Sequence, residues 1–236
     1  MPARRSRNPR LVAIVPVLDE ETTVGEVVRG LVARGIACVV VADNGSADRT
    51  AERARAAGAV VALETARGYG SACAAGAAAA ARFDPEILLF VDGDGSDVLD
   101  DVPALLAPIF DGRFDLVVGA REPLLPFAPH VRAGNWIAAV LLRRLFRCPA
   151  SDLGPMRAIR WSTFLALGMR DRRCGWTVEM QARASLIGAR VGEVPVRYRP
   201  RRAGSKISGT VRGSLVASYD ILRTIAVLAI ERVRTR

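Results

Sequence analysis

The first 120 residues alternate short apolar runs with helix-like stretches, and this alternation constrains the fold more than any other feature. We predict five strands, over 11–15, 37–41, 59–63, 87–91 and 115–119. The stretches between them have helical spacing, and two of them are rich in alanine. Strands that alternate with helices favour a mostly parallel central sheet flanked by helices on both faces. The sequence therefore predicts a single α/β domain.

Local signals set some boundaries. Thr23 and Glu26 have the spacing of a capping box, which predicts a helix from there to about residue 33. After residue 120 the rhythm changes, and the expected elements are an irregular proline-containing loop over 122–129, helices over 133–146, 177–187 and 210–233, a strand over 191–196 and a basic loop over 197–209. We expect Trp136, Trp161 and Trp176 to be packing residues, with Trp176 also placed to stack on a sugar.

Polar clusters lie at the carboxyl ends of four of the predicted strands. They are Asp19-Glu20, Asp43-Asn44, Arg67-Gly68 and Asp92-Gly93-Asp94. In open parallel sheets, ligands bind beyond the carboxyl ends of the strands. We therefore expect these side chains to gather at one rim of the sheet and to form a ligand site there.

The strongest single feature is the segment ILLFVDGDGSD at 87–97. An apolar strand delivers Asp92 and Asp94, one residue apart, at its exit. Two carboxylates flanked by glycines suit a hard divalent cation, Mg²⁺ or Mn²⁺, which would bridge a substrate diphosphate. A solvated acidic turn is the alternative, because Asp and Gly are ordinary turn residues.

The charge balance points to anionic partners. The formal net charge is +10 with a single histidine, and much of the excess lies in the tail 1–10 and in 197–212. Nucleotide phosphates, nucleic acid or an acidic membrane face would suit such a chain. A basic nucleic-acid-binding protein is thus a rival hypothesis, although charge alone supports it, since the aromatic-basic pattern of single-strand binders is missing. We expect no nucleic-acid partner.

The spacing of the cysteines and the lengths of the apolar runs indicate the cellular compartment of the protein. The four cysteines are widely spread, with no paired or histidine-linked spacing, which disfavours a zinc site and a disulfide framework and fits a reducing cytosol. There is no apolar run before Leu11 and no run of the roughly 18 to 20 apolar residues that a spanning helix needs. We expect a cytoplasmic protein, with peripheral contact at the inner face of the membrane as a further expectation.

Four motifs in order resemble those of the family 2 glycosyltransferases, which have the GT-A nucleotide-diphospho-sugar transferase fold. They are VPVLDEE at 15–21, VADNGSADRT at 41–50, RGYGSACAAG at 67–76 and DGDGSD at 92–97. The glycines of the third motif are spaced unlike a dinucleotide-binding fingerprint, which argues against a dehydrogenase. The resemblance implies a metal-dependent, inverting transfer of a hexose from a nucleoside-diphosphate sugar of the GDP-mannose or UDP-glucose type.

The resemblance also assigns roles to single residues. Those implied to bind the donor are Pro16, Leu18, Glu20, Asp43, Asn44, Arg67, Gly68, Asp92 and Gly93. Within this set Asp43 would hydrogen-bond the base, while Asn44 replaces an aspartate that the family usually has. Asp92 and Asp94 are the implied metal ligands.

The second half resembles the polyprenyl-phosphate (dolichyl-phosphate) mannose and glucose synthase branch. The segments that carry this likeness are DLVVGAR at 115–121, SDLGPMRAIR at 151–160, GWTVEM at 175–180 and EVPVRYRPRRAGSKISG at 193–209. The likeness implies a polyprenyl-phosphate acceptor and a catalytic set of Asp94, Arg121, Asp152, Arg157, Glu179, Arg202 and Lys206.

These residue types suit a phosphate acceptor. Arginines present forked donors to phosphate groups. An ionised phosphate needs no general base, whereas the alternative, a soluble hydroxyl acceptor, would need one, and Asp152 and Glu179 are the acids available. Glu179 has the further interpretation of an orienting ion pair with a nearby arginine.

These inferences predict three parts of the chain. A basic tail covers 1–10, and a catalytic domain covers 11–209, with a donor-binding half at 11–120 and an acceptor half at 121–209. An amphipathic helix over 210–236 follows a basic lid at 197–212. The apolar helix would rest on an anionic membrane, and the alternatives are that it caps the core or pairs with a second copy.

Overall fold

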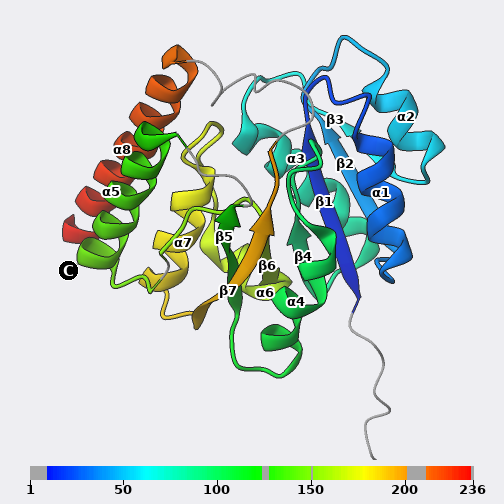
Figure 1. Ribbon diagram of the computed structural model, residues 1–236. Helices are drawn as coiled ribbons and strands as arrows, with labels where there is room; N and C mark the ends of the chain where they lie inside the picture. The colour runs from blue at the N-terminus through cyan, green and yellow to red at the C-terminus, as the bar shows by residue number, and fades with distance from the viewer. Residues whose placement is uncertain (1–9, 124–127, 150, 201–210, 235–236) are drawn as a thin grey trace, which may run out of the picture.

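The computed structural model describes residues 10–123, 128–149, 151–200 and 211–234. Its centre is a seven-stranded sheet with the order β3-β2-β1-β4-β6-β5-β7 (Figure 1). The strands are β1 Leu11–Val17, β2 Cys38–Asp43, β3 Val60–Leu63, β4 Ile87–Phe90, β5 Leu116–Pro123, β6 Arg157–Arg160 and β7 Val191–Tyr198. All neighbours pair in parallel except β6, which is antiparallel to both β4 and β5. The predicted single α/β domain with a mostly parallel sheet is confirmed.

Helices cover both faces of this sheet. They are α1 Val24–Ala33, α2 Thr50–Ala56, α3 Tyr69–Ala80, α4 Val102–Phe110, α5 Pro129–Phe146, α6 Trp161–Leu167, α7 Trp176–Leu186 and α8 Val211–Arg234, with short 3₁₀ turns at Ala81–Phe83 and Leu99–Asp101. Alternate strand residues point to opposite faces. Thus Ile14 and Leu88 pack with α3, α7 and α8, while Ala13 and Leu89 pack with α1 and α4.

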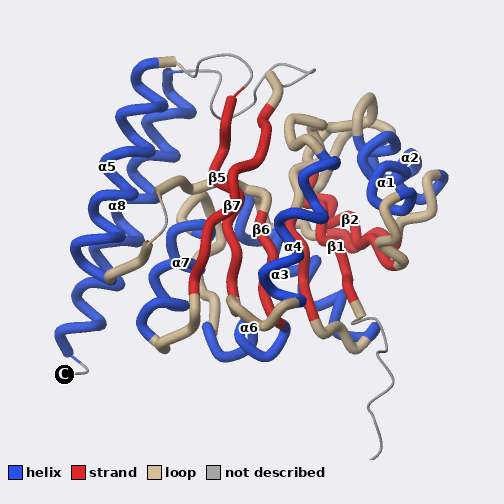
Figure 2. The backbone as a smooth tube through the Cα atoms, turned by 60° about the horizontal axis from the view of Figure 1, so that its bottom comes forward, coloured by secondary structure: helices blue, strands red, loops and turns tan. Residues whose placement is uncertain are grey.

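Helices α5 and α8 lie side by side at the β7 edge of the molecule, outside the layer that α7 forms (Figures 1 and 2). Both helices run from the rim where the parallel strands end toward the opposite end of the domain (Figure 1). No helix among the described residues is long and apolar enough to cross a bilayer.

Some predicted boundaries are wrong, and two elements were missed. β5 continues to Pro123 because β7 pairs with it as far as Tyr198, so each strand takes residues that we expected in loops. α5 begins at Pro129 rather than at residue 133, because proline suits the first turn of a helix. β6 and α6 were not predicted, and for β6 the reason is that arginines at both ends of this four-residue strand hide its apolar pattern.

The predicted capping box is also wrong, although α1 begins where it predicts. The Thr23 hydroxyl does not cap the helix. It donates instead to the carbonyl oxygen of Gly93 at 2.8 Å. The side chain therefore joins the start of α1 to the segment that follows β4, which lies at the candidate site.

Candidate active site

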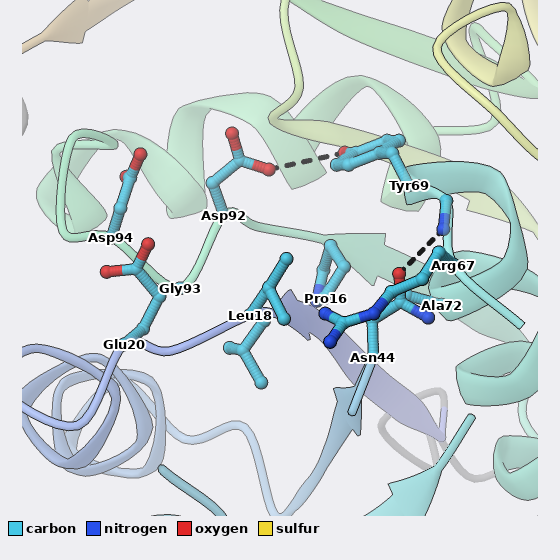
Figure 3. Close-up of a pocket in the computed structure, with 12 residues that line it drawn as sticks. Pro16, Leu18, Glu20, Asn44, Arg67, Tyr69, Ala72, Asp92, Gly93 and Asp94 are labelled. Carbon is cyan, nitrogen blue, oxygen red and sulfur yellow. Dashed lines mark hydrogen bonds between the residues drawn. The ribbon is translucent and has the colours of Figure 1, made fainter. Parts of the chain in front are cut away.

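A cavity of about 280 Å³ opens at the carboxyl ends of β1, β2 and β4. Its lining residues come from the four polar clusters and their neighbours: Pro16, Val17, Leu18, Glu20, Asn44, Arg67, Gly68, Tyr69, Ala72, Asp92, Gly93 and Asp94. Figure 3 shows Asn44, Arg67 and Tyr69 on one side of the cavity and Glu20 and Asp94 on the other, with Asp92 and Leu18 between them. Topology thus brings together residues from Pro16 to Asp94, which are 78 positions apart in sequence, as parallel strands predict.

Asn44 organises the wall of the cavity on the Arg67 side. Its side-chain amide donates to the carbonyl oxygens of Glu64 at 3.2 Å and Ala66 at 2.8 Å. Its carbonyl oxygen accepts from the backbone N–H of Gly68 at 2.7 Å. An aspartate could not donate to two carbonyls. The amide of Asn44 therefore stabilises the 64–68 turn in a way that an aspartate could not.

Gly68 is needed where this turn meets the second half of the chain. Its φ is +147°, and an added Cβ would lie 2.0 Å from the carbonyl oxygen of Arg172. The next residues complete the contact, since the N–H groups of Gly70 and Ser71 donate to the carbonyls of Arg173 and Arg172 at 3.1 and 3.0 Å. The start of α3 and the loop before α7 are consequently fixed against each other.

The segment after β4 is folded around its own carboxylates. Asp94 is buried, and one of its oxygens accepts from the N–H and the hydroxyl of Ser96 at 2.9 and 2.6 Å. Asp92 accepts from the Tyr69 hydroxyl at 3.2 Å (Figure 3). Gly93 permits a close approach to β1, because an added Cβ would lie 2.3 Å from Val17. This geometry differs from a solvated acidic turn, because the segment is packed.

Asp97 is a third carboxylate at this point, and it was not among the predicted site residues although it lies within the 87–97 segment. One oxygen accepts from the backbone N–H of Asp92 at 3.0 Å, while the other is buried without a hydrogen-bond partner among the described residues. Burial and the neighbouring Asp92 and Asp94 raise the pKa of Asp97 well above its usual range. Burial and Asp92 likewise raise the pKa of Tyr69, so its hydroxyl stays protonated and donates.

Asp43 does not line the cavity. Its carboxylate is buried and accepts from the N–H and the hydroxyl of Ser46 at 2.8 and 2.6 Å. Its role with the base of the donor stays a prediction. Three lining residues, Val17, Tyr69 and Ala72, were not selected individually, although each adjoins or lies within a selected motif.

The acceptor half brings together Arg121 and Asp152 at the end of β5. Arg121 donates from Nε and Nη2 to the two carboxylate oxygens of Asp152, at 2.7 and 2.8 Å, and Asn135 of α5 donates to the same carboxylate at 2.8 Å. The Arg121 guanidinium also lies 5.3 Å from the centre of the Tyr198 ring. Although burial opposes ionisation, these bonds to Arg121 lower the pKa of Asp152. The carboxylate is therefore a charged, fully engaged partner rather than a free base.

Arg157 lies in the interior. Only 1% of the residue is exposed. Its guanidinium donates to the carbonyl oxygens of Gly154, Leu153 and Thr177, the last two at 3.3 and 3.0 Å, and burial lowers its pKa. This geometry joins the 153–155 turn to α7. It argues for a structural role over the predicted contact with a phosphate.

Glu179 is buried as well. Its carboxylate accepts from the N–H groups of Arg170 and Asp171, at 3.0 and 2.7 Å, and from Arg183 at 2.7 Å. This arrangement matches the orienting ion pair that we gave as the alternative interpretation. The glutamate holds the loop whose carbonyls contact Gly70 and Ser71. Arg202 and Lys206, the two other predicted catalytic cations, lie outside the described residues.

Comparison with known proteins assigns this arrangement to a family. The model of the family described as Glycosyl transferase family 2 matches residues 12–124. An uncharacterized glycosyltransferase of Mycobacterium tuberculosis is 39% identical over 219 residues, which cover 92% of this chain and 98% of that protein. The dolichyl-phosphate hexose transferase of Haloferax volcanii is 30% identical over 211 residues, covering 87% and 90%.

A solved structure shares the fold. It is glucosyl-3-phosphoglycerate synthase from Mycobacterium tuberculosis in complex with Mn²⁺, uridine diphosphate and glucosyl-3-phosphoglycerate. It superposes with a TM-score of 0.77 at 19% identity and covers 94% of this chain and 80% of its own. The sheet order, the rim cavity and the relatives agree with the GT-A-like fold. The chain therefore belongs to glycosyl transferase family 2 and is a glycosyltransferase.

Proposed function

We propose that this glycosyltransferase moves a hexose from a nucleoside-diphosphate sugar to a polyprenyl-phosphate-like acceptor, with Mg²⁺ or Mn²⁺ at Asp92 and Asp94. In this reaction a phosphate oxygen of the acceptor attacks the anomeric carbon of the sugar. The bond from that carbon to the diphosphate oxygen breaks, and the nucleoside diphosphate leaves. One displacement inverts the configuration at the sugar carbon.

The chemistry of the rim supports the metal. Asp92, Asp94 and Asp97 place three carboxylates around one turn, and one buried oxygen of Asp97 lacks a partner among the described residues. Among the described residues, no group of three or more side chains makes up a cation site by itself. The pair Asp92 and Asp94 nevertheless fits Mg²⁺ or Mn²⁺, because such ions are often held by one or two carboxylates together with substrate phosphates. An ion held there would neutralise the negative charge that develops on the departing diphosphate.

The residues of the chain have separate tasks in this proposal. Tyr69 fixes the Asp92 carboxylate, and Asn44 shapes the turn that carries Arg67 to the mouth of the cavity. Arg67 is a forked donor for a phosphate or a base. The cavity would hold the nucleoside between Pro16, Leu18 and Ala72, which supply apolar contacts.

One observation favours a phosphate acceptor. The two acids that the sequence offers as a general base, Asp152 and Glu179, have their carboxylates engaged by arginines and by other N–H donors. A hydroxyl acceptor needs a base that can take its proton, and an acceptor phosphate is already ionised at neutral pH. The 30% identity to a dolichyl-phosphate hexose transferase supports the same acceptor class.

The alternative is a soluble hydroxyl acceptor on the same fold. The solved neighbour contains glucosyl-3-phosphoglycerate, which shows that such a scaffold can hold a soluble product. At 19% identity, the likeness to this structure shows only that the fold is shared. A base would then have to become free through rearrangement of Asp152 or Glu179.

Product partitioning tests the proposal. The purified enzyme is incubated with UDP-glucose or GDP-mannose labelled in the sugar, with MnCl₂ and with undecaprenyl phosphate in detergent, and then extracted with organic solvent. We expect label in the organic phase only when the lipid phosphate and the metal are both present. Transfer of label only to water-soluble acceptors would contradict the acceptor class and leave the glycosyltransferase assignment intact. Asp94→Asn is the matched inactive control.

A further inference from the structure

Exposed apolar side chains concentrate on two helices. Fourteen large hydrophobic residues are exposed among those described, and eight of them belong to α5 and α8. These are Trp136, Ile137, Val216, Tyr219, Leu222, Val227, Ile230 and Val233, which we call the α5–α8 face. The two helices hold only 18 and 24 of the 236 residues. The concentration is therefore far above what scattered surface residues would give.

The face is the outward side of helices whose other sides are already packed. Ile225 and Leu228 of α8 are 2% exposed and lie in the main core cluster. Tyr219 and Ile230 lie on the opposite side of the helix and are 67% and 55% exposed. An ordinary surface helix is apolar toward the core and polar outward. α8 is apolar on both sides, and its outward side has no packing partner among the described residues.

Trp136 is an exposed apolar residue on α5. We predicted that it is a packing residue, but 65% of it is exposed, so that prediction is wrong. In contrast, Trp176 is buried and Trp161 is partly buried, and both rings pack with Phe164. An exposed tryptophan on an apolar face suits the boundary of a bilayer, where its apolar ring and its polar N–H both find partners.

The charges around the face are positive. The exposed charged residues described on α5 and α8 are Arg132, Arg143, Arg144 and Arg223. α5 has no acid, and of the two acids of α8, Asp220 is buried against Arg173 and Glu231 is half-buried beside Arg170 and Arg183. Facing copies of such a surface would bring like charges together. Anionic lipids would attract it.

Hydrogen bonds connect the two helices of the face to residues of the candidate site. Trp136 follows Asn135, which donates to the Asp152 carboxylate held by Arg121. On α8, the buried Asp220 holds Arg173 at 3.0 Å, and the carbonyl of Arg173 accepts from Gly70 at the start of α3. A surface that bound this face would therefore lie beside the acceptor half of the molecule.

We propose that the α5–α8 face docks the enzyme on an anionic lipid bilayer, with α5 and α8 lying on the membrane. α8 has 24 residues and is about 36 Å long at 1.5 Å per residue. A long helix with an apolar face and flanking arginines, which does not meet the requirements for a span, is typical of interfacial docking. The inference deepens the proposed function by naming the surface that reaches a membrane-held acceptor, and lipid binding itself requires no sugar transfer.

Vesicle co-sedimentation without substrates tests the docking. The vesicles consist of phosphatidylcholine alone or of phosphatidylcholine partly replaced by phosphatidylglycerol. We expect the wild-type chain to sediment with the anionic vesicles, and the double variant Tyr219→Glu/Ile230→Glu to bind at least about tenfold more weakly, because both charges would enter the apolar boundary. The matched control is Phe110→Glu/Leu165→Glu, whose positions are 50% and 59% exposed away from the face and which adds the same charge. This control should bind like wild type.

A second pair of variants tests the positive rim. Arg143→Gln/Arg144→Gln should weaken binding to anionic vesicles by roughly tenfold or more, since each arginine near such a surface contributes about 1 kcal/mol. Arg53→Gln/Arg55→Gln, exposed on α2, removes the same charge elsewhere and should bind nearly as wild type.

Three outcomes would overturn the docking. They are equal binding by the face variant and its control, no sedimentation of the wild type with anionic vesicles, and a wild-type dimer in light scattering that Tyr219→Glu/Ile230→Glu converts to a monomer. The last would assign the face to a second copy.

Transfer to a short-chain, water-soluble prenyl phosphate is measured in parallel without vesicles. If the face variant keeps that transfer but loses vesicle binding, docking and chemistry are separate. If neither the wild type nor any variant transfers the sugar, the result contradicts only the proposed acceptor.

Discussion

The two halves of the molecule use charged residues in opposite ways. In the first half, Asp92, Asp94 and Arg67 line an open cavity. In the second half, Arg157 and Glu179 are turned inward and make internal hydrogen bonds. The first half thus presents charge to a ligand, while these residues of the second half hold loops in place. Residue type and motif alone do not distinguish these two uses, because the difference lies in burial and in partners.

Asp94 should show the largest effect on activity if the first half binds the ligand. Asp94→Asn keeps the size of the side chain but removes a charge at the proposed metal site. We expect turnover to fall roughly a hundred- to a thousandfold, as when one preorganised charge-stabilising group is lost. Thermal unfolding should change little, because the amide oxygen can still accept from Ser96. Full turnover of the variant in the presence of a chelator would contradict the metal role.

Arg157 should have the largest effect on stability. Arg157→Met leaves the carbonyls of Leu153, Gly154 and Thr177 buried without their donor. We expect the free energy of unfolding to fall by about 3 kcal/mol, as is usual when one partner of a buried charged network is removed. Chemical denaturation measures the loss, with the exposed Arg113→Met as the control. Unchanged stability together with lost transfer would restore the predicted contact with a phosphate.

These two residues also show how far sequence reasoning reaches. The fold and the cavity could be predicted, because strand-end clusters such as Asp92-Gly93-Asp94 are set by topology once the parallel sheet is recognised. The direction in which Arg157 points could not be predicted, because its partners at 153–154 and 177 meet it only through tertiary packing. The same limit applies to Asp97, whose burial depends on packing around β4 and on its bridge to Tyr198 of β7.

Asn44 tests whether the first half also contains structural polar groups. Asn44→Asp replaces an amide donor by a carboxylate that faces the carbonyls of Glu64 and Ala66. The turn that carries Arg67 should then loosen. We expect the dissociation constant of the donor nucleotide to rise roughly tenfold or more, from the loss of hydrogen bonds worth about 1 to 3 kcal/mol when buried groups are left unsatisfied. Calorimetry with uridine and guanosine diphosphates measures the change, and unaltered affinity for the one that binds wild type would show that the turn does not shape the cavity.

Asp152 gives the smallest expected effect and the most direct contrast between a base and an ion pair. Bonds to Arg121 outweigh burial and lower the pKa of Asp152, so the folded chain binds a proton there less readily than the unfolded chain does. The stabilisation is therefore present above the unfolded pKa of about 3.9 and is lost as the pH falls through the folded value. We expect the stability advantage of wild type over Asp152→Asn to be constant near neutral pH and to shrink below about pH 4. Urea denaturation at a series of pH values measures it.

The rate of transfer at neutral pH separates a base from an ion pair. Because the pKa of Asp152 is lowered, its carboxylate is ionised at neutral pH in either role, and only the size of the rate loss differs. If Asp152 is an ion-pair partner, Asp152→Asn should keep turnover within about tenfold of wild type. A loss of roughly a hundredfold or more, with donor affinity unchanged, would instead identify Asp152 as a general base and would favour the hydroxyl acceptor over the phosphate.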